Sequence, residues 1–550
     1  MEHVKRHRRT GRHLRGLVVG LLCVLGAGGS VSAQPAGLSA AERDVVRRVK
    51  ESSIREATAA LASDRMEGRG TLQPGGERAA AWIADRMKRL GLAPGGDGGS
   101  YLQQVPLRAT EFVPPTHVRV DDVDLPYGTD WSTLGTFADL QTTAPVVFVG
   151  YGLVSKTFGR DDLKDADLRG KIVVVVDGPP AGVTQQKWDE ISKDADLVPT
   201  LLARGIVGFI NIPSGRGLYP RPFVIDQTAR RSISAPTTDA PSSVPLMFFS
   251  TAGAERLLAG SGRTLAQAVA EADSATFRPF PLTAKVDVQF RLSRKDGTSP
   301  NVIGVIKGSD PSLAAEAVVF SAHYDAFGVM RQAVFNGAAD NAIGVAEMLS
   351  VAEAFAKAKA RPRRSLVFIA FTAEEYGLLG SRHYVAHPTW DLARTAAVLN
   401  LDGIGTEIMG PVKDMVAYGA PLNSMGALFA EVARAYGITP MDDPIPEAGV
   451  FSRSDHFPFA ERGVPGLMLV GSPVETGAAF KERFEAFEAT RYHQPSDDIY
   501  RDWYWKGART VADMMALIGH RVAQADAMPT FNAGTPYSVT RGQAPEAGKP

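Results

Sequence analysis

From about residue 284 onward, the sequence alternates short apolar runs, rich in β-branched and aromatic residues, with longer stretches of helical periodicity. The predicted strands are 317–322, 366–371, 396–401 and 466–470. The predicted helices are 344–358, 375–386, 424–436 and 505–525. Alternation of this kind is typical of parallel strands joined by crossover helices. The sequence therefore predicts an α/β fold built on a doubly wound, mostly parallel sheet.

The part of the chain before this region has a different sequence pattern. Short β-branched runs separated by Gly/Pro turns begin near residue 144, and a proline-rich segment follows at 277–281. We interpret this part as a small β-rich domain inserted into the larger one. The C-terminal tail, 529–550, is rich in Pro, Gly, Ser and Thr and has little to bury, so we expect it to be disordered. The predicted divisions are 1–33, 34–130, 131–278 (insertion), 279–528 and 529–550 (tail).

The first 33 residues have the order of a signal peptide. Basic residues come first, an apolar run follows at 17–27, and Val31-Ser32-Ala33 provides small residues for cleavage before Gln34. The run is too short to span a bilayer stably, although a short membrane anchor is an alternative. We therefore expect an exported protein, periplasmic or secreted, with no stable membrane insertion after cleavage.

Charge and cysteine content exclude several functions. The chain has 60 Lys and Arg residues against 60 Asp and Glu residues, with basic residues clustered only at the start. Nucleic-acid binding draws on clustered cations, so we expect no nucleic-acid partner. The single cysteine, Cys23, lies inside the predicted signal peptide, which excludes disulfides and thiol chemistry in the mature protein.

Residues able to ligate metal follow the predicted strands or lie in nearby loops. They are His323, Asp325, Asp340, Glu374, Glu375, Asp402 and His493. Each alone could be a helix cap or an ordinary polar group. Because the carboxyl ends of parallel strands meet at one edge of a sheet, we expect these side chains to gather there. So many carboxylates would repel one another without cations among them, and this donor set favours zinc, with manganese or cobalt as alternatives.

Four segments in this order resemble the co-catalytic di-zinc aminopeptidases and their relatives, which include aminopeptidase S, aminopeptidase Y and glutamate carboxypeptidase. The segments are 323–325, 337–344, 372–381 and 492–495. The resemblance covers about residues 45 to 525 and includes the predicted insertion. There, 147–152 and 168–173 look like parts of a protease-associated domain.

The resemblance implies two zinc ions per chain. One would be held by His323 and Asp402, the other by Glu375 and His493, and Asp340 would bridge both. A shared carboxylate suits metals about 3.5 to 4 Å apart, which is the usual spacing of two-metal sites.

The same resemblance assigns two catalytic roles. Glu374 would be the general base of a hydrolysis in which metal-activated water attacks a peptide carbonyl, and Asp325 would orient His323. The sequence departs from the family pattern at Ala339 and Ile343, which removes no ligand and concerns only the surroundings of Asp340.

The first functional hypothesis is a zinc-dependent aminopeptidase acting on peptide substrates. A carboxypeptidase-like or dipeptide hydrolase of the same fold is the alternative, and it would need a cation such as Arg331 or Arg453 to hold a terminal carboxylate. A glutaminyl cyclase, which binds one zinc and normally lacks the insertion, and a non-catalytic receptor-like module are further alternatives. The sequence leaves the oligomeric state unknown.

Overall fold

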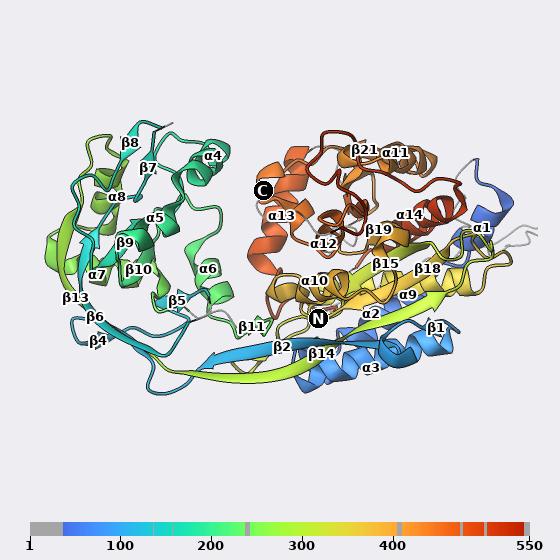
Figure 1. The fold of residues 1–550 in the computed structure, drawn as a ribbon, viewed down its shortest axis with the longest axis horizontal. Coiled ribbons are helices and arrows are strands. Elements are labelled where there is room, and N and C mark those ends of the chain that lie inside the picture. Colours follow the sequence, from blue (N-terminus) through green and yellow to red (C-terminus); the bar gives the residue numbers. More distant parts are fainter. Residues whose placement is uncertain are drawn as a thin grey trace, which may run out of the picture.

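The computed structural model describes residues 37–135, 137–156, 158–236, 242–403, 410–472, 477–499 and 503–543. The predicted signal peptide, 1–33, lies outside these residues. Within the described part of the chain, no helix combines the length and apolar character needed to cross a membrane. The chain forms two bodies connected by the long strands β2 (Leu102–Phe112) and β14 (Leu292–Ile306), which run along the lower edge of Figure 1.

The larger body is built on a ten-stranded mixed sheet. Its four central strands are parallel: β18 (Ser365–Phe371), β15 (Ala317–His323), β19 (Thr395–Asn400) and β22 (Gly466–Ser472). Antiparallel pairs flank them, with β14 beside β18 and β20 (Asp414–Tyr418) beside β22. Further strands at the two sides are β1 (Ala93–Pro94), β11 (Ser232–Ser234) and β21 (Thr439–Met441). The predicted α/β class is confirmed, and the sheet is mixed: besides its four central strands, β20 and β21 at one edge also pair in parallel.

Helices cover both faces of this sheet, as the doubly wound prediction required (Figure 1). One face buries Val318 and Phe320 against α2 (Glu51–Leu61), α3 (Pro74–Arg89), α9 (Ile343–Ala356), α11 (Met425–Ala435) and α14 (Trp505–Gln524). The other face buries Ala317 and Val319 against α10 (Leu379–Ala386) and α12 (Phe457–Ala460). Because both faces are covered, the central strands are apolar at almost every position, which made them visible in the sequence.

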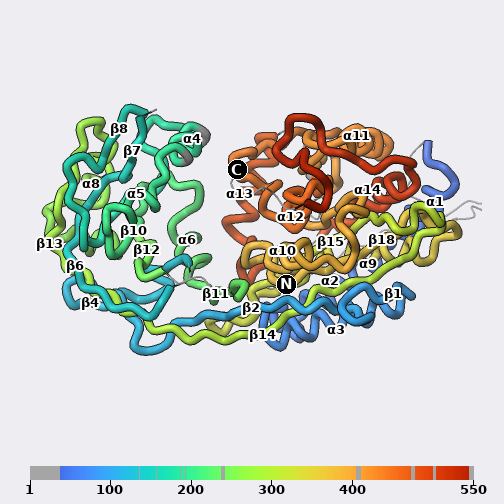
Figure 2. Tube along the Cα trace, viewed as in Figure 1, coloured from blue at the N-terminus to red at the C-terminus, as the bar shows by residue number. Residues whose placement is uncertain are grey.

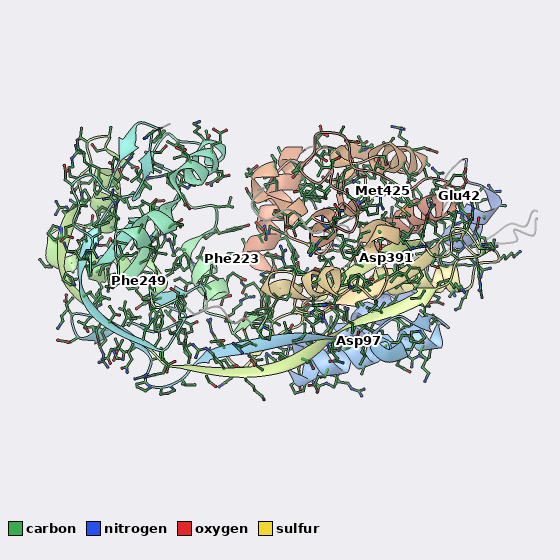
Figure 3. The ribbon with its side chains drawn as sticks, viewed as in Figure 1. Glu42, Asp97, Phe223, Phe249, Asp391 and Met425 are labelled. Carbon is green, nitrogen blue, oxygen red and sulfur yellow. The ribbon has the colours of Figure 1, made fainter. Side chains whose placement is uncertain are left out.

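The smaller body has an eight-stranded sheet of its own. In order, its strands are β4 (Val123–Asp124), β3 (His117–Val120), β13 (Phe280–Phe290), β6 (Leu140–Phe148), β9 (Ile172–Val176), β10 (Gly208–Ile212), β12 (Leu246–Phe249) and β5 (Trp131–Thr133). The two bodies have separate cores, with Phe249 buried in one and Met425 in the other (Figure 3). The sheet takes strands from both sides of 131–278, and the boundaries of the insertion stay a prediction.

One segment leads from the smaller body to the larger. Helix α6 (Arg221–Thr228) belongs to the smaller body, and β11 directly after it pairs antiparallel with β2 at the edge of the large sheet. Figure 2 shows α6 and β11 on the side of the smaller body that faces α13 (Gly477–Thr490). This segment brings the smaller body next to the predicted site.

The C-terminal segment differs from the predicted disordered tail. Residues 529–543 follow a defined path, in which the Arg541 guanidinium donates to the carbonyl of Ala396 at 2.8 Å. Phe531 and Tyr537 pack together at 5.6 Å, and Tyr537 also packs on Phe451. The prediction rested on the overall composition of the tail, which gave no weight to these aromatic residues. Residues 544–550 lie outside the described part of the chain.

Candidate metal centre

The predicted metal ligands come together at the carboxyl end of the central strands. His323 ends β15, Glu375 follows β18, and Asp402 follows β19. Asp340 lies in the turn that opens α9, and His493 lies in the loop after α13. The separate crossover connections of the sheet therefore deliver five ligand-capable residues to one place.

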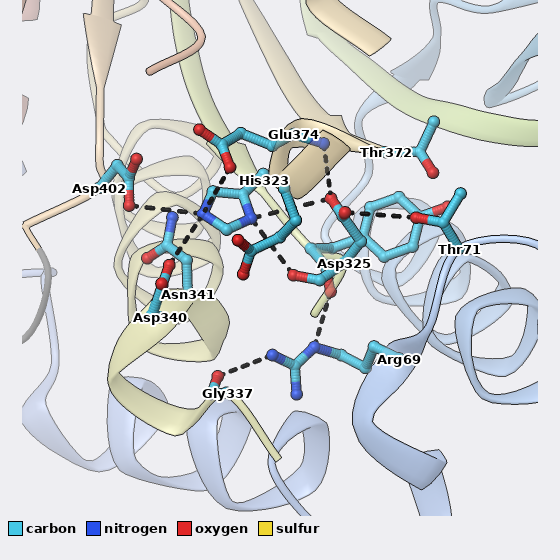
Figure 4. Close-up of polar contacts among 12 residues, drawn as sticks. Arg69, Thr71, His323, Asp325, Gly337, Asp340, Asn341, Thr372, Glu374 and Asp402 are labelled. Carbon is cyan, nitrogen blue, oxygen red and sulfur yellow. Dashed lines mark hydrogen bonds and ion pairs between the residues drawn. The ribbon is translucent and has the colours of Figure 1, made fainter. Parts of the chain in front are cut away.

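These residues form two groups that share Asp340. In the first, Nε2 of His323 lies 3.2 Å from Oδ1 of Asp340 and 3.4 Å from Oδ1 of Asp402 (Figure 4). In the second, Nε2 of His493 lies 3.1 Å from Oδ2 of Asp340 and 2.8 Å from Oε2 of Glu375. Each oxygen of Asp340 thus faces a different imidazole, as a bridging carboxylate would.

The donor set fits zinc. Oδ1 of Asp402 and Oε1 of Glu375 are buried and have no hydrogen-bond partner among the described residues. Buried polar atoms without partners are costly, and a cation between them would remove that cost. Imidazole nitrogens together with carboxylate oxygens are ordinary zinc ligands.

The charges of the site depend on one another. Burial raises the pKa of Glu375 to about 7. Burial alone would also raise the pKa of Asp340, but hydrogen bonds from His323 and His493 outweigh burial and hold it well below its usual value. Burial disfavours the charged form of His323, yet Glu374 and Asp402 raise its pKa well above the usual value. Without metal, protons on the imidazoles compensate the carboxylates, so metal binding must displace protons.

Glu374 lies beside the first group rather than inside either one. Its Oε2 is 3.9 Å from Nε2 of His323, and burial raises its pKa well above the usual carboxylate value. Glu374 and Glu375 are neighbours in a single turn of 3₁₀ helix, Glu374–Tyr376, yet only Glu375 joins a ligand group. The structure thus gives the two glutamates different surroundings.

Asp325 contacts both His323, a predicted metal ligand, and Glu374, the predicted base. Its main-chain oxygen lies 3.2 Å from Nδ1 of His323, and its carboxylate Oδ1 lies 3.7 Å from the same nitrogen. That carboxylate also accepts hydrogen bonds from the main-chain N–H of Glu374 at 3.1 Å and from the hydroxyl of Thr71 at 3.2 Å. Its nearest contact to the imidazole is therefore through the backbone, and its role in orienting His323 stays a prediction.

Several residues that support the site were not identified from the sequence. Asp497 accepts hydrogen bonds from the main-chain N–H groups of Ala339 and Asp340 at 2.9 and 3.0 Å. Ser454 donates its hydroxyl to Oδ2 of Asp402. Asp497 could have been found because it lies four positions after His493 in the same loop.

Arg69 is a fully buried cation beneath the site. Its guanidinium donates to the carbonyl oxygens of Tyr324 and Asn336 at 2.6 Å and of Gly337 at 2.7 Å (Figure 4). Burial lowers its pKa to about 10, and the carboxylates of Asp497 and others oppose that effect, so it remains charged at neutral pH.

Cavities of different size adjoin the ligands, and two of them concern the substrate. A small one, of about 40 Å³, touches Asp340, Glu374 and Asp402 and has apolar walls that include Phe484 and Phe487. A larger one, of about 790 Å³, reaches Glu375 and His493 and is lined by both bodies.

The two arginines considered for a terminal carboxylate lie in different cavities. Arg331 lines the large one and pairs with Asp226 at 3.1 Å. Arg453 lines the small one and donates to the hydroxyls of Tyr219 and Tyr492 at 3.0 and 3.3 Å.

Comparison with solved structures establishes the class of fold. An aminopeptidase from Aneurinibacillus sp. strain AM-1 superposes with a TM-score of 0.59 at 19% identity, covering 89% of this chain and 97% of that one. The zinc aminopeptidase BSAP from Bacillus subtilis superposes with a TM-score of 0.53 at 21% identity, covering 87% and 97%. The fold is therefore that of the zinc aminopeptidases.

Sequence comparison then gives the family. Residues 301–518 match the model of Peptidase family M28, so the chain contains a domain of this metallopeptidase family. Aminopeptidase YwaD of Bacillus subtilis is 33% identical over 37% of this chain and 40% of its own length. A probable glutamate carboxypeptidase of Arthroderma benhamiae is 28% identical over 42% of this chain and 31% of its own. The chain thus spans less than half the length of these relatives, and the predicted family resemblance is confirmed for the peptidase domain.

Proposed function

We propose that this protein is a zinc-dependent exopeptidase that holds two zinc ions and removes N-terminal residues from peptides. The observation that carries this proposal is the pair of ligand groups sharing Asp340, with Glu374 beside one of them. His323 and Asp402 would hold one ion, Glu375 and His493 the other, and Asp340 both. When bound, two zinc ions lower the pKa of water toward neutrality and polarise a carbonyl oxygen.

Glu374 is suited to accept and return the proton. It belongs to neither ligand group, it borders the small cavity, and its burial favours proton uptake. A general base works best when its pKa is raised above that of an ordinary carboxylate toward the working pH, and burial shifts the pKa of Glu374 in that direction. Glu374 would take a proton from the attacking water and deliver it to the leaving amine.

The cavities favour cleavage near an N-terminus. Beyond Glu374 and Asp402 the space is only about 40 Å³, so little of a substrate fits on that side. The side toward His493 offers about 790 Å³ for the rest of a peptide. An N-terminal ammonium group on the small side would meet carboxylates, which suits an aminopeptidase better than a carboxypeptidase.

A carboxypeptidase-like activity is the second candidate. Arg331 is exposed on the large cavity and could attract a terminal carboxylate. Both arginines already have partners, Asp226 for Arg331 and two tyrosine hydroxyls for Arg453, so a terminal carboxylate would have to compete with them. We also propose that the smaller body, interpreted as a protease-associated domain, shapes substrate access, because it forms part of the wall of the large cavity.

The test combines metal analysis with a substrate panel. Purified protein should contain two zinc ions per chain, lose activity to a chelator, and release chromophore from aminoacyl substrates with a free amino group. N-acylated versions should be inactive. One bound metal would favour a glutaminyl cyclase, and activity on C-terminal substrates alone would favour a carboxypeptidase.

We further propose export by the predicted signal peptide, to the periplasm or the medium. The support is the order of basic, apolar and small residues in 1–33. Secreted or periplasmic material should begin at or near Gln34 when its N-terminus is sequenced. Retention of Met1 on membrane-bound material would contradict export.

A further inference from the structure

A side chain from the smaller body reaches the metal centre. Gln227, in helix α6, places its Oε1 2.9 Å from Nδ1 of His493, whose Nε2 faces Asp340 and Glu375. The two residues are separated by 266 positions in the chain. The second ligand group is therefore in contact with a helix that lies outside the 301–518 peptidase domain.

The chemistry of this contact fixes the form of the imidazole. When the Gln227 oxygen accepts a hydrogen bond, Nδ1 of His493 carries the proton and Nε2 is left with a free lone pair. That is the form needed at a metal, and a partner on the distal nitrogen also holds the ring in orientation. The reversed amide would donate to Nδ1 and leave the proton on Nε2, where it would block ligation.

The same segment holds His493 at two further places. The Arg230 guanidinium donates to the main-chain oxygen of His493 at 2.7 Å and pairs with Asp226 at 2.9 Å. It also lies over the ring of Phe327, 3.7 Å from its centroid, and Phe327 in turn packs edge-on against the His493 ring at 4.6 Å. The backbone and one face of the ligand are thus fixed along with its distal nitrogen.

The neighbouring residue is connected to the smaller body as well. Tyr492 stacks on His493 at 3.7 Å, and its hydroxyl accepts from Arg453, which also donates to the hydroxyl of Tyr219 just before α6. Strand β11 pairs with β2 and ties the far end of the segment to the large sheet. Residues 219–234 therefore contact the Tyr492-His493 loop at several points and end in a strand of the large sheet.

The two ligand groups differ in this respect. Nδ1 of His323 faces the main-chain oxygen and carboxylate of Asp325, inside the peptidase domain. Nδ1 of His493 faces a side chain from the smaller body. We propose that Gln227 is the positioning residue of the second ligand group, so that the smaller body completes the metal centre and sets zinc affinity at Glu375 and His493. This inference rests on the proposed zinc function and deepens it.

The test measures zinc binding to the full-length protein by competition with a chromophoric chelator. In Gln227→Leu, affinity for one of two zinc ions should fall roughly 10- to 100-fold, the usual effect of losing such a partner, while the other ion binds as in the wild type. Gln227→Glu keeps an acceptor oxygen and should restore binding to within a few-fold of the wild type. Gln141→Leu, at an exposed position of β6 in the same body, is the matched control and should bind both ions normally.

The outcomes separate this inference from the proposed function. If Gln227→Leu binds both ions as tightly as the wild type, weakens both equally, or is not rescued by Gln227→Glu, the positioning role is wrong. If the wild-type protein itself binds fewer than two zinc ions, the dinuclear proposal fails before any variant is compared.

Discussion

The carboxylate of Asp325 accepts a hydrogen bond from the main-chain N–H of Glu374 at 3.1 Å. Asp325 follows β15 and Glu374 follows β18, and these strands are adjacent and parallel in the sheet. The position of the proposed base therefore depends on a side chain at the end of the neighbouring strand. The same carboxylate lies near His323, so one residue connects a proposed metal ligand to the proposed base.

This relationship predicts a graded effect of substitutions at Asp325. Asp325→Ala removes the acceptor and should lower kcat about 10- to 100-fold, because the base and the first ligand lose a shared support. Asp325→Asn keeps an oxygen acceptor and should retain more activity than the alanine variant. Steady-state kinetics at saturating zinc measures both, and equal activity of Asp325→Ala and wild type would refute the coupling.

The two adjacent glutamates should respond differently to the same change. Glu374→Gln should retain two zinc ions while turnover falls by roughly two to four powers of ten, the usual contribution of a positioned base. Glu375→Gln should instead lose zinc, because an amide is a poor replacement for a ligating carboxylate. Zinc content and turnover are measured on both variants. Loss of zinc from Glu374→Gln alone would show that the roles are reversed.

Arg69, at the end of the short 3₁₀ helix Asp64–Arg69, should contribute strongly to stability. Arg69→Met leaves main-chain carbonyls without donors and removes a buried cation beneath the acidic site. We expect the free energy of unfolding to fall by about 3 to 5 kcal/mol, as when a buried charge loses its partner. Urea denaturation measures it, with Arg78→Met as control. Arg78 pairs with Glu67 at a more exposed position, so its loss should cost less than about 1 kcal/mol.

Asp513 in α14 should make stability depend on pH. Burial raises its pKa to about 8, so the folded protein keeps this proton at neutral pH, whereas the unfolded chain releases it above about pH 4. The contribution of Asp513 to the free energy of unfolding is therefore largest below pH 4 and declines as the pH rises toward 8. From pH 5 to pH 8 the free energy of unfolding should fall less in Asp513→Asn than in the wild type. The difference between the two decreases should be roughly 1 kcal/mol or more. An exposed control, Asp526→Asn, should follow the wild type.

Local patterns in the sequence determined the class of fold and the candidate ligands. The central strands are apolar runs because both their faces are covered, and polar residues directly after such runs indicated the edge where ligands gather. These signals extend over a few neighbouring residues, so they can be detected without the structure. The antiparallel strand β14 was missed because its first half is mostly exposed and pairs with β2 outside the core.

The sequence alone indicated the α/β class, the resemblance to a metallopeptidase family and a set of candidate metal-binding residues. The resemblance also implied which of these residues share Asp340, and the tertiary structure decided how closely they lie, with Asp340 facing both imidazoles and Glu374 outside the ligand groups. It also decided which distant residues support them, such as Asp497 on the backbone of Asp340 and Gln227 on His493. These contacts join segments from different elements and bodies. Side-chain periodicity reports only which face of its own helix or strand a residue occupies, so it cannot reveal the partner that the fold places opposite.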